Sequence, residues 1–296
     1  MARWDGYRCA TGEFITTVDS DDYLPKNAIK ILASHMVDKN VDLVQGAITR
    51  VLGFVKKSLY HHGPDAFPLH RVVCQPELFD KYYLNFFGKG FFPIVMWSKL
   101  YRKSVIDEAF KNTKLCSPDF PFVGEDHFFN MKLFPFVRSM YMTDEPVYFY
   151  RYGGMSTGHF SPTYPSLFVL SDIRLKLLDS NKLQDGYKSL FVEYCNTVYY
   201  HAHQLIEYKH STRDEIVNFF RDESSKRELM HRMVDFFSAN ETINQRVLLM
   251  VKHDYDAMYQ LVIDELRTQE RSIKYKCRLV LLRMIEFFYK IRSLNF

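Results

Sequence analysis

The chain has 296 residues, 47% of them hydrophobic, and a formal net charge of +4. This composition can build one large or two modest cores. The mild charge gives no argument for nucleic-acid binding, so we expect no nucleic-acid partner.

Cysteine usage and hydropathy point to an ordinary reducing compartment. Five cysteines are scattered without a Cys-x-x-Cys pair, which suggests neither a disulfide framework nor a zinc knuckle. Met1 to Gly6 have no apolar core of the signal-peptide kind, and no apolar run approaches the ~18 residues of a membrane span. We therefore expect a cytoplasmic protein that is not integral to a membrane.

The first predicted element is a strand from Phe14 to Val18 that runs directly into Asp19, Asp21 and Asp22. Residues of the Val, Ile and Thr type favour a buried strand. Carboxylates crowded at its end repel one another unless a cation lies between them. Because Mg²⁺ and Mn²⁺ prefer oxygen ligands, the pattern predicts a divalent-cation site.

A helix and a second strand are predicted next. Pro25 suits a first helical position, and Ile29, Leu32, Ala33 and Met36 follow at helical spacing. The run 41–44 then reads as a strand. The order strand, acidic turn, helix, strand is typical of a layered α/β domain, in which ligands bind beyond the carboxyl ends of strands.

A second pair of acids, Glu125 and Asp126, follows Gly124 and opens a predicted helix that continues with apolar residues to Leu133. Acids in a first helical turn also favour the positive end of the helix dipole, which is a purely structural explanation. Together with the upstream acids, however, they complete an apparatus of cation site and separate carboxylate base for displacement at a sugar carbon.

Four blocks of the sequence resemble the family 2 glycosyltransferases of the GT-A fold. The blocks, in order, are Ala10–Phe14 leading into Val18–Leu24, then Trp97–Arg102, then Gly124–Asp126, and finally Tyr148–Arg151. The resemblance covers about residues 1 to 160. It implies an inverting transferase that moves a sugar from a nucleotide sugar to an acceptor hydroxyl, often in the synthesis of bacterial surface polysaccharide.

The resemblance also assigns roles residue by residue. The Asp-x-Asp motif falls on Asp19 and Asp21, which implies that they bind Mn²⁺ or Mg²⁺ at the donor diphosphate. The Glu-Asp motif falls on Glu125 and Asp126, which implies that Asp126 is the base that deprotonates the acceptor hydroxyl and that Glu125 lies in the same binding site. His159 falls in the loop where some family members have a further metal ligand.

Three more residues fall in family blocks, and each has an ordinary alternative. Arg151 matches a basic residue that meets the diphosphate. Trp97 either forms a stacking face for a sugar or packs in the core, and Lys99 belongs to the same block. The aromatic stretch from Phe79 to Phe92 lies where an acceptor wall is expected, although aromatic residues at this density usually pack against one another.

The chain departs from the family at its start. A complete GT-A domain has on the order of 80 further residues before the segment matched by Ala2 and Arg3, and the family usually has Asn where Trp4 stands. We therefore expect a shortened domain with an incomplete Rossmann-like sheet, an unpaired sheet edge and weak donor binding. The alternative is a non-catalytic binding or scaffold remnant of a glycosyltransferase.

The remaining residues read as helices. We expect a GT-A-like domain over residues 1–162 and an all-α region over 163–296, with helical periods at 167–178, 187–206, 228–237 and 255–266. From Arg271 onward a basic amphipathic helix either closes this bundle or lies on an anionic membrane surface. The second option would make the protein peripheral at the inner face of the membrane, next to a glycan or lipid-linked glycan acceptor.

Overall fold

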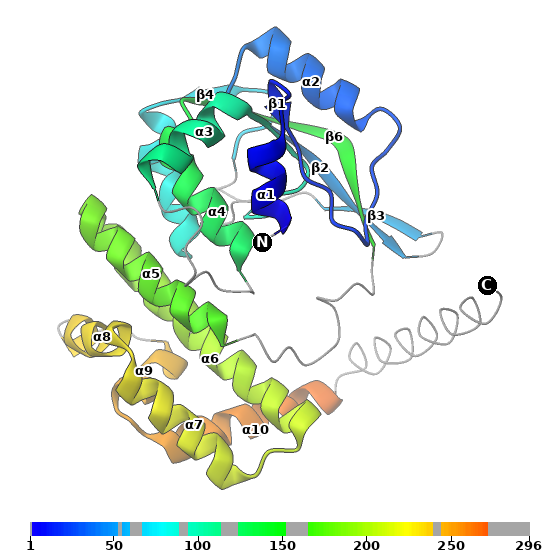
Figure 1. The fold of residues 1–296 in the computed structure, drawn as a ribbon. Helices are drawn as coiled ribbons and strands as arrows, with labels where there is room; N and C mark the ends of the chain where they lie inside the picture. The colour runs from blue at the N-terminus through cyan, green and yellow to red at the C-terminus, as the bar shows by residue number, and fades with distance from the viewer. Residues whose placement is uncertain are drawn as a thin grey trace. The chain divides into compact units, whose positions relative to one another are not determined.

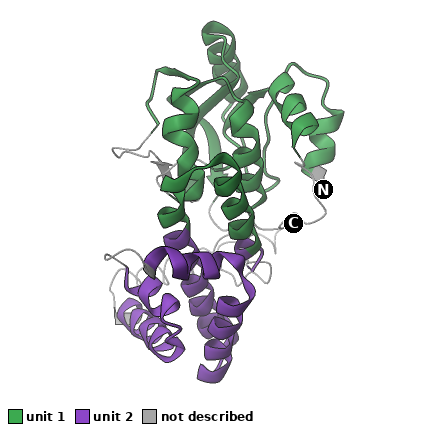
Figure 2. Ribbon diagram, turned by 90° about the vertical axis from the view of Figure 1, so that its left-hand side faces the viewer, with its two compact units in different colours: residues 1–154, 169–190 green, residues 155–168, 191–296 purple. Residues whose placement is uncertain are grey.

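The computed structural model describes residues 2–52, 55–59, 67–88, 94–113, 124–151, 165–238 and 244–271. The chain forms two compact units, residues 1–154 with 169–190 and residues 155–168 with 191–296 (Figure 2). The domain boundary expected at residue 162 stays a prediction, because it falls outside the described residues.

A mixed six-stranded sheet forms the centre of the first unit (Figure 1). Its strand order is β1 (Phe14–Ile15), β5 (Lys99–Arg102), β2 (Leu43–Leu52), β6 (Ser139–Arg151) and β4 (Val72–Cys74), and β3 (Val55–Leu59) pairs with β2. The pair β2–β6 is parallel and the others are antiparallel. The mixed α/β sheet expected from the sequence is confirmed, with β1 at an edge of the described sheet.

Helices cover both faces of this sheet because successive strand residues point to opposite sides. Val44 and Leu100 pack with Leu32 of α2 (Ala28–Lys39) in one core cluster. On the other face, Tyr101 meets Phe129 of α4 (Glu125–Leu133), with ring centroids 5.8 Å apart. The same layer contains α1 (Ala2–Cys9) and α3 (Lys103–Asn112), which lie beside α4 in Figure 1. The short helices η1 (Leu78–Tyr82), η2 (Tyr83–Phe87) and η3 (Phe134–Phe136) belong to this unit too.

Helix α2 differs in start and phase from the sequence prediction. It begins at Ala28, and Pro25 instead accepts the Ala28 amide in the preceding turn (3.0 Å). Its buried stripe is Ala28, Leu32 and Met36, at spacing i, i+4, i+8. Ile29, predicted to lie on the same helix face as Leu32 and Met36, is 47% exposed because it lies about 100° around the helix from Ala28.

Two of the strands also differ from prediction. Strand β1 ends at Ile15, three residues before the predicted end, and β2 extends to Leu52, well past the predicted end at 44. The register between β2 and β6 shifts around Gly46. A side chain at Gly46 would lie within 2.4 Å of Val147, so the close approach of these strands requires glycine there.

The described residues from 165 onward are mainly helical, as predicted. The helices are α5 (Ser166–Asn181), η4 (Gln184–Gly186), α6 (Tyr187–Lys209), α7 (Arg213–Lys226), α8 (Glu228–Ser238), α9 (Gln245–Val251) and α10 (Tyr255–Arg271). Thr212 and Glu215 form a reciprocal capping box that starts α7. Phe220, Met233 and Met258 are among the buried residues of the second unit.

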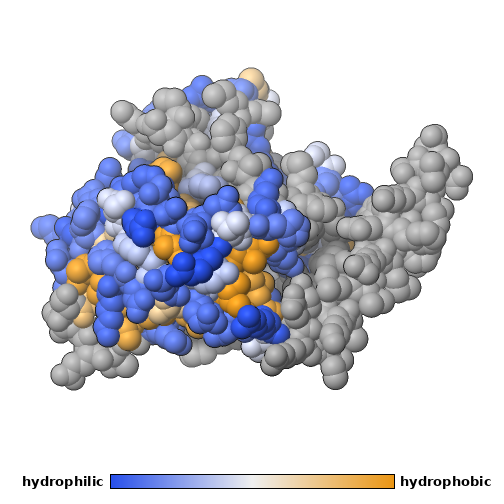
Figure 3. Space-filling model, turned by 90° about the horizontal axis from the view of Figure 1, so that it is seen from below, coloured by the Kyte–Doolittle hydropathy of each residue, from blue (hydrophilic) through white to orange (hydrophobic). Residues whose placement is uncertain are grey.

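Within the described ranges, every helix is too short or too polar to cross a bilayer. On the coloured residues of Figure 3, hydrophilic side chains surround smaller hydrophobic patches. The basic segment beyond Arg271 lies outside the described residues, so its two interpretations stay open.

Candidate active site

The acidic loop that follows β1 is fastened to the end of β6. The Tyr148 hydroxyl accepts from the Asp19 amide (3.0 Å) and donates to Asp22 Oδ2 (2.9 Å). The Arg151 amide donates to the other Asp22 oxygen (2.8 Å). Two backbone hydrogen bonds between Tyr23 and Phe149 complete the attachment. The loop is therefore held by the sheet rather than left to solvent.

The carboxylates of Asp19, Asp21 and Asp22 converge within this loop. One oxygen from each lies within 4.8 Å of the others. Both oxygens of Asp22 already accept hydrogen bonds, whereas the carboxylate of Asp21 accepts none from the described residues. Burial and neighbouring acids raise the pKa of Asp19 and of Asp22. An all-oxygen set with surplus negative charge fits a hard divalent cation.

The second acid pair opens α4, as predicted. Gly124 adopts a φ of 92°, a left-handed conformation that favours glycine, and the helix begins at Glu125. Asp126 Oδ2 accepts from the Met96 amide (3.2 Å). The side-chain amide of Asn130 donates through Nδ2 to the backbone carbonyls of Asp126 (2.9 Å) and Ile94 (2.7 Å), which ties the helix to the segment before β5. The Asp126 carboxylate thus has a fixed orientation.

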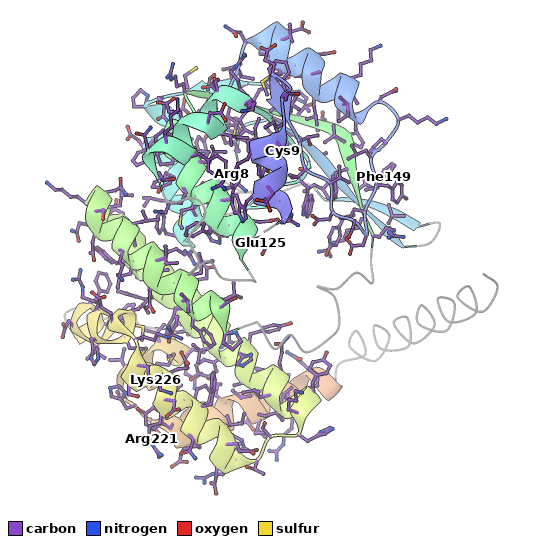
Figure 4. The ribbon with its side chains drawn as sticks, in the orientation of Figure 1. Arg8, Cys9, Glu125, Phe149, Arg221 and Lys226 are labelled. Atoms are coloured by element: carbon purple, nitrogen blue, oxygen red, sulfur yellow. The ribbon has the colours of Figure 1, made fainter. Side chains whose placement is uncertain are left out.

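Arg3 joins the two acid groups. Its guanidinium donates to Asp19 Oδ1 (2.5 Å), to Asp126 Oδ1 (2.6 Å) and to Glu125 Oε1 (3.1 Å). Figure 4 shows Glu125 at the end of α4 that lies beside α1. The acids after β1 and those of α4, more than a hundred positions apart in sequence, therefore face one another across one side chain.

No role for Arg3 was predicted from the sequence. It sits in the segment that matches the start of the family block, but nothing in its local pattern indicates a partner 122 positions away. The sequence does indicate that some basic residue lies near these acids, because five carboxylates in two clusters need compensating positive charge. Only the packing of α1 identifies which one.

Burial sets the charge behaviour of this site. It raises the pKa of Asp126, and Arg3 opposes that shift. Lys99, on β5, is fully buried and donates to the Val95 carbonyl, and desolvation lowers its pKa to about 7. Lys99 is thus a buried side chain close enough to Asp126 to feel its charge.

The other predicted site residues are placed differently. Trp97 is 9% exposed and stacks on Tyr148 and Tyr150, with centroids 4.5 and 5.4 Å away, which favours the packing alternative over a sugar face. The Arg151 side chain donates to the Asp21 carbonyl, so it lies at the acidic loop. His159 lies outside the described residues, and its role stays a prediction.

A family model described as Glycosyl transferase family 2 matches residues 2–110. This region includes Arg3, the acidic loop, Trp97 and Lys99. Residues 2–110 are therefore similar to the family 2 glycosyltransferases. The match ends before Glu125 and Asp126, whose inclusion in the site follows from their contacts with Arg3.

Two curated relatives match about half of the chain. The uncharacterized glycosyltransferase EpsJ of Bacillus subtilis is 29% identical over 152 residues, which cover 51% of this chain and 41% of EpsJ. Glycosyltransferase GlyA of Streptococcus pneumoniae is 24% identical over 151 residues, which cover 51% of this chain and 20% of GlyA. The chain therefore spans less than half the length of either relative.

Solved structures show the same fold. S. aureus TarS 1-349 superposes with a TM-score of 0.50 at 17% identity, covering 89% of this chain and 69% of TarS 1-349. Its complex with UDP-GlcNAc gives 0.52 at 18% identity, covering 89% and 70%. At these identities the likeness shows the fold alone, and it agrees with the GT-A-like sheet expected for the family.

Proposed function

We propose that this chain is a metal-dependent, inverting glycosyltransferase that moves a sugar from a nucleotide sugar to an acceptor hydroxyl. The observation that carries the proposal is the position of Arg3, which is hydrogen-bonded to both the candidate cation ligand Asp19 and the candidate base Asp126. A cation site and a base in one place are the two requirements of this displacement. The similarity of residues 2–110 to a transferase family supports the same chemistry.

Asp126 would act as the general base. Its carboxylate would take the proton of the acceptor hydroxyl while the hydroxyl oxygen bonds to the anomeric carbon. The bond from that carbon to the donor phosphate oxygen would break, and the nucleoside diphosphate would leave with the electron pair. Burial raises the pKa of Asp126 toward the working pH, which improves a base in a proton transfer.

Asp19 and Asp21 would hold Mn²⁺ or Mg²⁺. The cation, when bound, would supply positive charge to the departing diphosphate. Asp22 has another task, because its two oxygens fix the loop to Tyr148 and Arg151. His159 stays a predicted additional ligand.

The acceptor and the site of action are part of the proposal. We expect a glycan or a lipid-linked glycan in surface polysaccharide synthesis, reached at the membrane through the basic segment that begins at Arg271. Replacing Lys274, Lys276 and Arg278 with Gln should weaken sedimentation of the full chain with vesicles containing anionic lipid. Equal sedimentation of the two proteins would contradict membrane contact through this segment.

The test of the reaction measures sugar transfer and donor hydrolysis with a panel of nucleotide sugars. UDP-GlcNAc is included because a structural neighbour was crystallised with it. Donors are supplied at millimolar concentration, so that turnover is measured even if binding is weak. We expect turnover with Mn²⁺ or Mg²⁺, loss of turnover with EDTA, and inversion at the anomeric carbon of the product.

Variants assign the roles. Asp21→Asn should abolish turnover at every metal concentration, because it removes a metal ligand. Asp126→Asn should abolish turnover because it removes the base. Asp38→Asn, at an exposed position on α2, is the matched control and should retain full turnover. Donor binding by calorimetry without turnover from any donor would instead support the non-catalytic binding module.

A further inference from the structure

Arg3 is outnumbered by the carboxylates that it contacts. One guanidinium serves Asp19, Glu125 and Asp126, so the cluster carries surplus negative charge. The exposed fractions of these acid side chains are 22%, 33% and 20%, which leaves them only partly screened by water. A further cation would offset the charge that one guanidinium leaves uncompensated.

Arg3 is held in this position by aromatic packing. Trp4 and Tyr7 of α1 contact Phe129 of α4, with ring centroids 5.3 and 5.1 Å apart, and the Tyr7 ring is stacked. The Trp4 ring also meets Phe110 of α3 (6.1 Å). Because α4 carries the acids and α1 carries Arg3, this packing aims the guanidinium at them.

Asp19 is the point of conflict. Its Oδ1 is the acceptor of Arg3, and its carboxylate is one of the three that converge as possible metal ligands. A divalent cation and a guanidinium repel each other and compete for the same carboxylate. Asp126 has no such conflict, since Arg3 and the Met96 amide contact different oxygens of its carboxylate.

We propose that Arg3 is a positioning residue that exchanges Asp19 for the divalent cation while it keeps its hydrogen bond to Asp126. In the metal-free site, Arg3 occupies Asp19 and therefore competes with the incoming metal. In the metal-bound site, Arg3 orients the base Asp126. By thermodynamic linkage, the metal weakens the Arg3–Asp19 contact to the same extent. This inference rests on the proposed function, because it assumes that the Asp19 loop binds a cation.

The test measures Mn²⁺ affinity of the full chain without donor, by the loss of the free Mn²⁺ electron spin resonance signal. Arg3→Gln should bind Mn²⁺ about threefold to tenfold more tightly than the wild type, since a neighbouring positive charge is removed. Arg3→Lys keeps the charge and should stay within about twofold of the wild type. Arg8→Gln, an exposed arginine of the same helix, should leave the affinity unchanged.

A kinetic readout separates positioning from folding. At saturating Mn²⁺, Arg3→Gln should lower kcat about tenfold or more with little change in the donor KM, because the base loses its orientation. Near-ultraviolet circular dichroism of Trp4 and its neighbours reports whether α1 stays packed. Arg3→Lys should recover part of the lost kcat.

The outcomes distinguish this inference from the function beneath it. If the wild type binds Mn²⁺ and Asp21→Asn abolishes that binding, but Arg3→Gln binds no more tightly, the exchange at Asp19 is wrong and the metal site stands. If the wild type binds no Mn²⁺, both the metal site and the exchange are wrong. If the Arg3→Gln variant does not fold, Arg3→Lys is the deciding protein, and a change of more than about twofold in its Mn²⁺ affinity overturns the inference.

Discussion

Two arginine–carboxylate networks, one in each unit of this chain, differ in their ratio of acidic to basic side chains. Arg3 contacts three carboxylates in the first unit. In the second unit, Arg246 grips both oxygens of Glu265 (2.8 and 2.9 Å), and His203 contacts the same carboxylate (2.8 Å). The first network has three carboxylates for one guanidinium, whereas the second has a single carboxylate for one guanidinium and one imidazole.

The pKa values follow this difference. Burial raises the pKa of Asp126, and Arg3 offsets only part of that rise. For Glu265, burial also acts upward, but the hydrogen bonds of Arg246 and His203 prevail and lower its pKa. A carboxylate with a lowered pKa stabilises the fold in its charged form, whereas one with a raised pKa is kept charged at a cost. Surplus charge therefore separates the candidate site from a structural ion pair.

The largest expected effect is on Asp126. Asp126→Asn should lower kcat by about 10²- to 10⁴-fold, the range of a lost general base. The free energy of unfolding of the Asp126→Asn variant should not fall, because the neutral amide removes a charge that burial disfavours. Arg3 keeps Asp19 and Glu125 as carboxylate partners. Urea unfolding of the variant and the wild type at pH 7 checks this. A clearly less stable variant would place Asp126 with the structural ion pairs.

Glu265→Gln should show the opposite pattern. We expect a loss of about 2–3 kcal/mol in the free energy of unfolding at pH 7, because Arg246 and His203 lose their shared acceptor. The folded pKa of Glu265 is lowered, so its contribution is present above the unfolded pKa of about 4.3 and is lost as pH falls through the folded pKa. The difference from the wild type should therefore shrink in acid, as measured by urea unfolding. A pH-independent difference would contradict the ion-pair explanation.

Lys99 is a second buried ionisable group of the first unit whose charged form we expect to destabilise the fold. Its folded pKa of about 7 lies below the unfolded value of about 10.4, so between these values the unfolded chain binds more protons. The stability of the wild type should rise with pH across this window. Lys99→Met should be more stable by about 1–2 kcal/mol at pH 7 and should lose that slope. Parallel slopes in thermal or urea unfolding would show that Lys99 does not titrate there.

Local pattern predicted much of the candidate site. The apolar stretch before Asp19 and the glycine before Glu125 both mark changes in preferred backbone conformation, and these can be predicted from neighbouring residues. The order of elements then placed both acid groups in the α/β part of the chain. Their convergence needed the sheet, because β5 and β6 carry the segments that hold them.

The features that the sequence did not predict depend on packing at long range. The phase of α2 is set by which stripe meets the sheet, and Ile29 is apolar but lies off that stripe. Arg3 finds its partners only after aromatic rings dock α1 onto α4. The burial of Lys99 depends on the direction in which a strand residue points. These are properties of contacts between elements, which spacing along the chain does not contain.

We expect the smallest effect on stability from an ion pair that has a short distance but is exposed to solvent. Lys226 lies 2.7 Å from Asp222, one helical turn earlier on α7, and the exposed fractions of these side chains are 61% and 60% (Figure 4). Lys226→Gln should change the free energy of unfolding by less than about 0.5 kcal/mol, because solvent and salt screen the pair. Urea unfolding at low and high salt measures it beside Glu265→Gln. A loss of unfolding free energy comparable to that of Glu265→Gln would mean that distance, rather than burial and charge balance, decides what an ion pair contributes here. The contrast between the two networks would then no longer identify the site.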